Sequence, residues 1–195
     1  MEVAKVNQKL SDATGFSSEQ IAVIKDTIAK GTTNTELALF LFTAKSVGLN
    51  PLNKEIWCYK DHKGNMLTFA GRDGFLTKAQ QNPRYKGIRS SEVREKDVFS
   101  LDIANNEIKH QKEFTAPSAI IGAYCIAFVQ NGEPTIEWVD FKTYDKGFGS
   151  WKSHPADMIK KVAETHALKK AFGISGLQSE HDWDFTPEKA YPDRS

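Results

Sequence analysis

Cysteine is scarce in this chain, and long apolar runs are missing. Cys58 and Cys125 are the only cysteines, and neither belongs to a CxxC pair. Isolated cysteines in apolar, strand-like segments favour small buried side chains in a reducing compartment over a disulfide or a zinc site. No apolar run approaches the roughly 20 residues of a membrane span, and the first residues do not resemble a signal-peptide core. We therefore expect a cytoplasmic protein without a membrane partner.

Motifs of common enzymes are also missing. The sequence contains neither a P-loop nor GxGxxG, so nothing marks a cradle for nucleotide phosphates. Ser90, Ser91 and Ser118 lack the context of a nucleophile elbow. His154 and His166 have no cysteine or carboxylate at useful ligand spacing, so no metal site is expected. These absences argue against an enzyme.

One enzymatic alternative stays open. Asp102, Glu107 and Lys109 loosely match the acid, acid-x-lysine pattern of metal-dependent nucleases. However, Glu-x-Lys is frequent by chance, and the surrounding segment is strongly polar. A solvated pair of strands is therefore the favoured interpretation, and a nuclease is kept as the alternative.

Charge is balanced overall but unevenly distributed. The net charge is +1, with 39% hydrophobic and 26% charged residues, as is ordinary for a globular protein. Residues 54–89 hold eight basic and three acidic residues, and residues 142–170 hold seven and three. Acids outnumber bases over residues 90–115 and again from residue 176 onward. Two basic blocks can converge on one cationic groove, although composition alone favours lysines that merely cover solvated faces.

Hydrophobic periodicity and turn signals predict an α+β fold. Ser17-Ser-Glu-Gln20 resembles a capping box for a helix that ends at Gly31, and a second helix runs from about Asn34 to Gly48. These two helices are expected to pack against the core or to form a subunit contact. A short helix before Pro83 and antiparallel strands follow, the strands at about residues 55–60, 66–70, 86–101, 107–115, 119–130 and 135–141. This order favours α+β over a doubly wound parallel sheet.

The last substantial element is a helix with both ends marked. Pro155 suits its first position, Ser153 or His154 suits its cap, and Gly173 suits its end. A glycine-containing loop over residues 142–150 leads into it. The helix carries four lysines, so its surface suits an anionic ligand.

One stripe of this helix is a candidate phosphate-binding surface. Lys161, Thr165 and Lys169 fall at i, i+4 and i+8, which places a hydroxyl between two cations. Apolar positions nearly surround the rest of the helix, so we expect it to be buried except for this narrow stripe. Lysines that extend to solvent or pair with acids such as Glu164 are the plainer explanation.

Aromatic and cationic residues gather in the predicted hairpin. Trp57 and Tyr59 share one face by alternation, and Ile56 and Cys58 share the other. If the aromatic face is open, its rings can stack on bases, whereas core packing of these rings is an equal alternative. The cations that could hold phosphates beside them are Lys54, Lys60, Lys63 and Arg72.

Four segments resemble those of a known protein family. They are Gly48-Leu-Asn-Pro-Leu-Asn-Lys-Glu-Ile56, Gly71-Arg-Asp-Gly-Phe75, Trp151-Lys-Ser-His-Pro155 and Ala171-Phe-Gly173. Their order and spacing resemble the phage single-strand annealing proteins of the RecT/Redβ (Bet) family, in particular its Redβ-like branch. The resemblance extends over nearly the whole chain, from about Phe16 to Trp183.

The resemblance implies a recombinase that needs no ATP. Such proteins bind the single-stranded DNA left by a 5′–3′ exonuclease, form rings or helical filaments, and anneal a complementary strand in homologous recombination. No cofactor is required, although Mg²⁺ can assist annealing, and no catalysis is expected. The implied partners are single-stranded DNA, the annealed duplex, further copies of the chain, a cognate exonuclease and the host single-strand-binding protein, in the cytoplasm of a bacterial host. A passive single-strand-binding protein is a third interpretation.

The resemblance also implies a fold and a division of the chain. The fold would be that of the eukaryotic ring-forming annealing proteins, with N-terminal helices, a β-hairpin and an antiparallel sheet packed on a long basic helix. DNA would lie in a cationic groove, with the Lys54 hairpin facing the final helix. We expect a flexible lead-in over residues 1–16, an annealing and oligomerisation domain over 17–178 and an acidic, poorly ordered tail over 179–195.

Matching the family's segments residue by residue assigns roles. Trp151 and His154 belong to the Trp-x-Ser-His-Pro segment and would shape the entrance of the helix. The basic positions along the DNA would be Lys54, Lys142, Lys146, Lys160, Lys161 and Lys169, with Lys152 and Lys170 beside them. Two departures matter. Ala156 and Asp157 stand where Redβ-like relatives carry basic residues, and the chain stops soon after Asp184, where relatives continue into a segment implicated in docking the exonuclease and the host protein.

Overall fold

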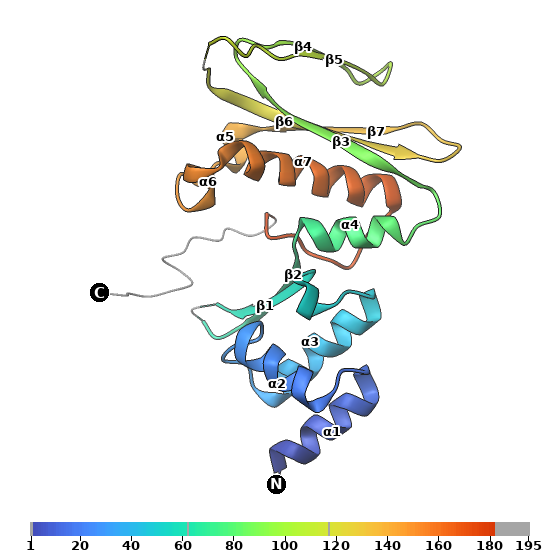
Figure 1. Ribbon diagram of the computed structural model, residues 1–195, viewed down its shortest axis with the longest axis vertical. Coiled ribbons are helices and arrows are strands. Elements are labelled where there is room, and N and C mark those ends of the chain that lie inside the picture. The colour runs from blue at the N-terminus through green and yellow to red at the C-terminus, as the bar shows by residue number, and fades with distance from the viewer. Residues whose placement is uncertain (1, 62, 117, 182–195) are drawn as a thin grey trace. The chain divides into compact units, whose positions relative to one another are not determined.

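The computed structural model describes residues 2–61, 63–116 and 118–181, and Figure 1 labels its elements. Contacts divide the chain into two compact units, Met1–Lys78 with Gly176–Ser195, and Ala79–Ser175. Helices and antiparallel strands occur in both, so the predicted α+β class is confirmed. Units defined by contacts need not coincide with functional domains, so the domain boundaries expected from the sequence stay predictions.

Three helices begin the first unit, α1 (Glu2–Thr14), α2 (Ser18–Thr27) and α3 (Asn34–Val47). The predicted capping box is present, because the Gln20 N–H donates to the Ser17 hydroxyl and the Ser17 N–H donates to the Gln20 side chain. Helix α3 ends at Gly48 in the left-handed conformation, also as predicted.

Helix α1 occupies the segment that we expected to be a flexible lead-in. Leu10 and Thr14 on this helix are buried, and α1 packs on α2 and α3. An isolated helix of 13 residues is marginal in water, so α1 depends on this packing. The sequence offered no such tertiary information, which is why the helix was missed.

The predicted hairpin forms in this unit from β1 (Ile56–Lys60) and β2 (Met66–Ala70), which pair antiparallel. The short 3-10 helix η1 (Pro51–Asn53) precedes the hairpin, and α4 (Arg72–Gln80) follows it.

The chain returns to β2 near its end. The Ala70 N–H donates to the Gln178 carbonyl at 2.9 Å, and Ala70 forms a parallel bridge with Ser179. Ser179 is buried, so the segment expected to be a poorly ordered tail begins with a residue held against the hairpin. Most of that predicted tail, residues 182–195, lies outside the described residues.

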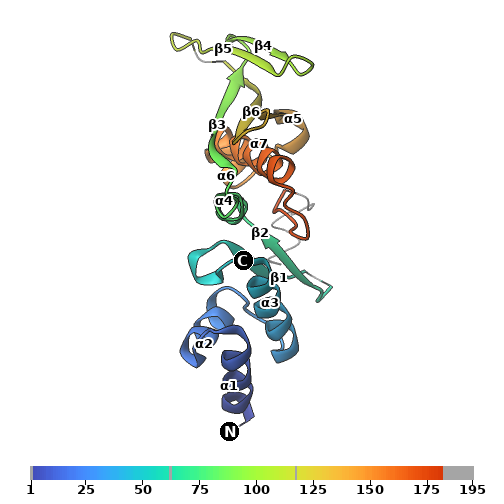
Figure 2. The ribbon, with the colours of Figure 1, turned by 90° about the vertical axis from the view of Figure 1, so that its right-hand side faces the viewer.

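An antiparallel sheet and one long helix form the second unit. The sheet order is β3 (Tyr85–Arg94), β6 (Ile120–Val129) and β7 (Thr135–Asp140), and α7 (Pro155–Phe172) packs on one face of it, as Figure 2 shows. The sheet side of this core is built from small side chains at alternate positions of β6, Ala123, Cys125 and Ala127. The helix side is built from Ile159, Val162, Ala163 and Ala167.

A second hairpin covers part of the other sheet face. It consists of β4 (Val98–Asp102) and β5 (Glu107–Gln111), and Figure 2 shows it across the sheet from α7. Phe99 stacks on Tyr124 and Trp138 of the sheet, with ring centroids 5.8 and 5.1 Å apart. The single strand expected over residues 86–101 is therefore two strands, β3 and β4.

Asp97 explains that break. Its carboxylate accepts hydrogen bonds from the backbone N–H groups of Arg94 and Glu113, at 2.8 and 2.9 Å. These bonds fasten both ends of the β4–β5 hairpin to one side chain. Side-chain capping of a turn by aspartate interrupts a strand that hydrophobicity alone would continue.

Helix α7 begins and ends where predicted, but its cap differs. Pro155 lies in the first turn, and Gly173 ends the helix with a left-handed φ of 61°. His154 occupies the cap position, yet its side chain does not bond the helix, and its Nδ1 lies 2.8 Å from Ser153 Oγ. The segment expected to be a loop contains α5 (Phe141–Tyr144) and leads into α6 (Ser150–Ser153).

Candidate nucleic-acid interface

Two of the four family-like segments meet in the first unit. The Glu55 carboxylate accepts hydrogen bonds from the Asn50 N–H at 2.7 Å and from the Thr77 hydroxyl at 3.2 Å. A Cβ at Gly74 would lie 2.1 Å from the Glu55 carbonyl oxygen, so only glycine allows α4 to pass this close. Between these contacts Lys54 holds a left-handed φ of 60° with an exposed side chain.

The hairpin presents its aromatic face on the more open side. Ile56 and Cys58 are buried, whereas Trp57 and Tyr59 are half-buried. Tyr59 packs edge-on against Phe69, with ring centroids 5.9 Å apart. The aromatic face is therefore partly accessible, which leaves base stacking by Trp57 and Tyr59 as a prediction with the required exposure.

The two cysteines are free and buried, as predicted. Burial raises the pKa of the Cys58 thiol to about 11, and the charge of Glu36 adds to this effect. Burial also raises the pKa of Cys125, on the α7-facing side of β6. Thiols kept protonated in this way are packing groups rather than nucleophiles.

The cations around the hairpin differ in whether an acid already neutralises them. Lys60 Nζ lies 3.0 Å from a carboxylate oxygen of Glu36, and Arg72 Nε lies 3.2 Å from one of Asp73. Lys54 and Lys63 are exposed, and their ammonium groups have no partner among the described residues. A phosphate can therefore approach Lys54 or Lys63 without displacing a carboxylate.

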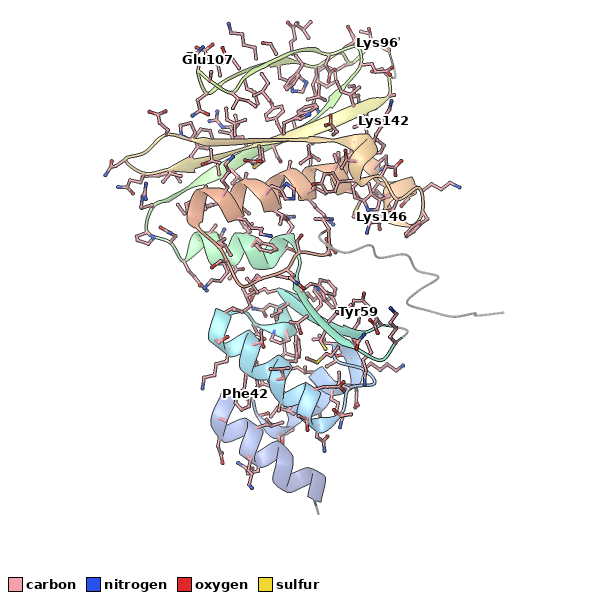
Figure 3. All side chains as sticks on the ribbon, turned by 180° about the vertical axis from the view of Figure 1, so that it is seen from behind. Phe42, Tyr59, Lys96, Glu107, Lys142 and Lys146 are labelled. Carbon is pink, nitrogen blue, oxygen red and sulfur yellow. The ribbon has the colours of Figure 1, made fainter. Side chains whose placement is uncertain are left out.

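Basic residues also surround the start of α7. Figure 3 labels Lys142 and Lys146, which lie before α6, and Tyr59 on the hairpin of the first unit. Lys142 and Lys152 are exposed without a side-chain partner among residues 2–61, 63–116 and 118–181, whereas Lys146 is half-buried and interacts within the chain.

The aromatic residue of this region is not available for stacking. Trp151 is only 6% exposed, belongs to the core under α7, and packs against Phe141 with ring centroids 6.1 Å apart. It can shape the entrance of the helix but cannot stack on a base. His154 is exposed beside it in the chain.

The lysines of α7 also divide into paired and unpaired residues. Lys160 Nζ lies 3.0 Å from Asp157, and Lys170 Nζ lies 2.6 Å from Glu137 on β7. Lys161 is half-exposed and has no ion pair within the described part of the chain. Lys169 is half-exposed too. Asp157, which departs from the family pattern, therefore forms an ion pair with Lys160, one of the predicted DNA-binding lysines.

The predicted polar stripe is interrupted at its centre. Thr165 is fully buried, and its hydroxyl has no hydrogen-bond partner among the described residues. Leu168, on the same side of the helix, is fully buried as well. Thr165 therefore packs as a small β-branched side chain in this structure, and the contact to DNA is left to Lys161 and Lys169 on either side.

The wall predicted to face α7 belongs to the other unit. The hairpin with Lys54 lies in the first unit and α7 in the second. A groove between them stays a prediction, and each set of cations is described by its own surroundings.

The residues of the nuclease alternative lie on the β4–β5 hairpin. Asp102 and Glu107 are opposite each other, but Asp102 accepts hydrogen bonds from the side chain and backbone N–H of Asn105, at 2.7 and 3.1 Å. These bonds lower the pKa of Asp102 and give the carboxylate a role in the turn. Over the described residues, no cluster of three or more histidine, cysteine or acidic side chains could hold a metal ion.

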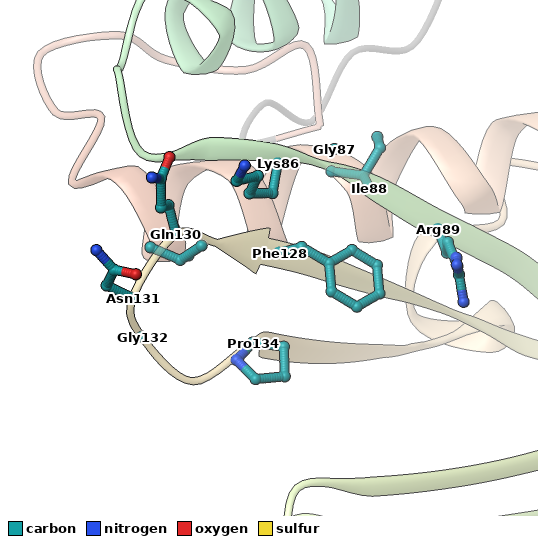
Figure 4. A pocket seen from close by; sticks show the side chains of 10 residues that line it. Lys86, Gly87, Ile88, Arg89, Phe128, Gln130, Asn131, Gly132 and Pro134 are labelled. Atoms are coloured by element: carbon teal, nitrogen blue, oxygen red, sulfur yellow. The ribbon is translucent and has the colours of Figure 1, made fainter.

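Sequence reasoning missed one cationic site. A pocket of about 600 Å³ lies at the end of the sheet, as Figure 4 shows, and its lining includes Lys86 and Arg89 of β3 and Phe128 of β6. The Arg89 guanidinium lies 5.2 Å from the centroid of the Phe128 ring. Both cations were counted in the first basic block, but their position beside Phe128 depends on the pairing of β3 with β6, for which the sequence held no signal.

Together these features define an α+β protein in which unpaired cations accompany a partly exposed aromatic hairpin and a long basic helix. A model of the RecT family matches residues 14–191 of the chain. The chain therefore belongs to the RecT family, which confirms the resemblance drawn from its four segments.

A curated relative comes from a bacteriophage. The chain is 24% identical over 188 residues to the "Recombination protein bet" of Escherichia phage lambda, which covers 90% of this chain. This chain spans 63% of the length of that relative. In residues 2–61, 63–116 and 118–181, every helix is too short or too polar to cross a membrane.

Proposed function

We propose that this protein anneals complementary single strands of DNA in phage recombination, without ATP. The observation that carries the proposal is a set of unpaired lysines at predicted DNA-binding positions of a RecT-family chain. They are Lys54, Lys63, Lys142, Lys152 and Lys161, and none of them forms an ion pair in the described part of the chain. Phosphates supply the counter-charge that these side chains lack.

The proposed mechanism requires no chemical step. The lysines neutralise phosphates and keep the strand extended, and the partly exposed Trp57 and Tyr59 provide surfaces on which bases can stack. Base pairing with the complementary strand then supplies the free energy of annealing. No cofactor is needed, and Mg²⁺ would act only by screening the phosphates of the two strands.

Self-association would hold many nucleotides at high local concentration. The two helices that the sequence suggested as a subunit contact carry exposed apolar side chains, with Val23 on α2 and Leu39 and Phe42 on α3 exposed by 50%, 57% and 46%. Exposed apolar side chains of this size can be covered by contact with another chain. We therefore propose that further copies of this chain bind at α2 and α3, in a ring or a filament.

A fluorescence annealing assay tests the proposal directly. Two complementary oligonucleotides, each with one dye of an energy-transfer pair, are mixed with the protein in the absence of ATP. We expect pairing to be faster than for the oligonucleotides alone, and the combined substitution of Lys161→Ala and Lys169→Ala to slow it about tenfold. If the variant folds and anneals as fast as the unaltered protein, the assignment of α7 is contradicted. If the unaltered protein does not accelerate annealing, the proposed function is contradicted.

The same experiment separates the alternatives. A metal-dependent nuclease would shorten a labelled strand when Mg²⁺ is added, and substitution of Asp102 by asparagine would abolish that shortening. A passive single-strand-binding protein would protect the strand from an added nuclease without accelerating pairing. A cognate exonuclease and a host single-strand-binding protein stay proposed partners, because this chain covers only part of its relative.

A further inference from the structure

The pocket at the end of the β3–β6–β7 sheet lies on the face turned away from α7. In β6 the side chains of Cys125 and Ala127 belong to the α7 core, so Phe128 points to the opposite face by alternation. Arg89 is paired with Ile126 and shares that opposite face, while its neighbour Ser90 reaches Glu164 on α7. The pocket is therefore separated from α7 by the sheet itself.

The pocket is cationic without compensating acids. Lys86 and Arg89 are exposed, and neither has an ion pair among the described residues. None of the 10 residues that line the pocket is acidic. A hollow of this charge, open to solvent, favours an anionic ligand.

The remaining lining suits a nucleobase. Arg89 already lies over the face of Phe128, so the two form a stacking platform like those on which proteins hold bases. The side chains of Gln130 and Asn131 are exposed and have no hydrogen-bond partner within the described part of the chain. Each carboxamide offers a donor and an acceptor, which matches the edge of a base, whereas the carboxylates of an acidic peptide need donors only.

The backbone of the pocket is shaped for close approach. Gly87 has a φ of 108° and lies in a register shift between Tyr85 and Ile88, where β3 bulges away from β6. On the far side, the Asn106 amide of the β4–β5 turn donates to the Pro134 carbonyl at 2.7 Å and fixes the rim. Figure 4 shows the lining side chains around this end of the sheet.

We propose that this pocket binds one nucleotide unit of single-stranded DNA, with its phosphate at Lys86 and Arg89 and its base against Phe128. The proposal rests on the proposed function, and it adds a contact that the cations of α7 do not include. Lys161 lies on the side of α7 opposite its sheet-packed residues Ile159 and Ala163, with a helix about 10 Å wide and the sheet between. A strand segment in the pocket is therefore a different segment from one held at Lys161.

The first test concerns the phosphate contact. Fluorescence anisotropy measures the affinity for a dye-labelled oligonucleotide of thymidines over a series of salt concentrations. The double variant Lys86→Ala with Arg89→Ala should bind about tenfold more weakly, and the slope of log K against log salt should fall by about 0.7, because one phosphate is no longer neutralised. The matched control removes two exposed lysines of the same unit outside the pocket, Lys96→Ala with Lys109→Ala, and should bind within about twofold of the unaltered protein.

A second variant tests the base. Phe128→Leu should weaken binding of the thymidine oligonucleotide about tenfold without changing the salt slope, and should not alter binding of an abasic oligonucleotide of equal length. If Phe128→Leu does not fold, the double cation variant and its control decide alone, because their substitutions lie on the surface.

The possible failures are distinguishable. If the unaltered protein does not bind the oligonucleotide, the proposed function fails. If it binds but the pocket variants behave like the Lys96 and Lys109 control, the pocket assignment alone is overturned. It is overturned as well if the pocket variants keep their affinity for DNA but lose binding of a labelled glutamate-rich peptide, since that result would make the pocket a peptide site.

Discussion

Asp97 Oδ2 lies 3.0 Å from His110 Nε2, and both side chains are buried at the base of the β4–β5 hairpin. His110 continues the chain of contacts, because its Nδ1 lies 3.3 Å from the Tyr124 hydroxyl on the sheet. With the N–H groups of Arg94 and Glu113, Asp97 thus connects the hairpin to the sheet in a single network.

This network makes stability depend on acidity. Burial alone would raise the pKa of Asp97, but hydrogen bonds from Glu113, His110 and Arg94 lower it to about 2. Because the folded pKa lies below the unfolded value of about 4, the stabilisation is fully present above pH 4 and is lost as pH falls toward 2. The free energy of unfolding should therefore fall by about 2 kcal/mol over that range, as measured by urea titration.

A variant identifies Asp97 as the source of that dependence. Asp97→Ala should cost about 3 kcal/mol near neutral pH, because it leaves two N–H donors and a histidine without their acceptor. The remaining loss of stability between pH 4 and 2 should be smaller than in the unaltered protein. If the free energy of unfolding of this variant falls as much between pH 4 and 2 as that of the unaltered protein, other carboxylates cause the acid sensitivity.

Gly74 allows the close packing of α4 on the loop before β1. In Gly74→Ala the new Cβ would lie 2.1 Å from the Glu55 carbonyl oxygen, so backbone must move. We expect a loss of about 3 kcal/mol in the free energy of unfolding, at the upper end for overpacking. Thermal melting measures it, and Gly64→Ala on the β1–β2 turn is a useful contrast, because a Cβ there meets nothing within 4 Å.

The Gly64 variant has a cost of its own. Gly64 has a φ of 82°, so alanine there is strained by its backbone but meets no neighbour. Its cost should be about 1 kcal/mol, less than that of Gly74→Ala. Equal costs would mean that contact with Glu55 does not limit α4.

Lys54 separates the effect of charge from that of backbone strain. Lys54→Gly removes the ammonium group and relieves the left-handed φ of 60°, so it should weaken binding of single-stranded DNA while keeping or raising the melting temperature. Lys54→Ala should weaken binding equally but melt below the glycine variant. Fluorescence anisotropy and thermal melting measure the two effects, and DNA binding that follows stability instead of charge would refute the proposed contact.

Asp157 offers a test by gain of function. Its carboxylate pairs with Lys160 at 3.0 Å, on the surface and in the first turn of α7. Asp157→Asn should release Lys160, raise the affinity for single-stranded DNA several-fold and steepen its salt dependence by about 0.7. It should cost less than about 1 kcal/mol of stability, since surface pairs and first-turn acids contribute little.

The matching experiment uses a pair on the other end of the helix. Glu137→Gln removes the partner of Lys170, whose Nζ lies 2.6 Å away. If any released lysine raises the affinity, both variants will do so. If only Asp157→Asn raises the affinity, the DNA lies along the start of α7. If neither variant changes the affinity, Lys160 is not part of the interface.

The exposed apolar residues of α3 predict where copies of the chain meet. Leu39→Glu with Phe42→Glu should shift the protein toward smaller species, because charges replace apolar side chains at the proposed contact. Light scattering after size-exclusion chromatography, with and without DNA, measures the mass. Ile103→Glu is the control, since this 75% exposed residue lies on the β4–β5 hairpin, outside the proposed contact, and should leave the mass unchanged.

Several elements could be predicted because their signals are local. The capping box at Ser17, the left-handed stops at Gly48 and Gly173 and the hairpin on either side of Gly64 each depend on residues within one or two turns of chain. The four family-like segments were likewise readable in order, and the family match over residues 14–191 agrees with them.

The chain's own sequence thus determined its class, its family and its set of candidate cations. Only the tertiary structure decided which cations are available. Glu137 meets Lys170 across 33 positions of sequence, Thr165 is buried although its helical neighbours are lysines, and Arg89 meets Phe128 across two paired strands. Such pairings depend on strand register and helix rotation, which arise from packing the whole core and leave no periodic trace in the sequence.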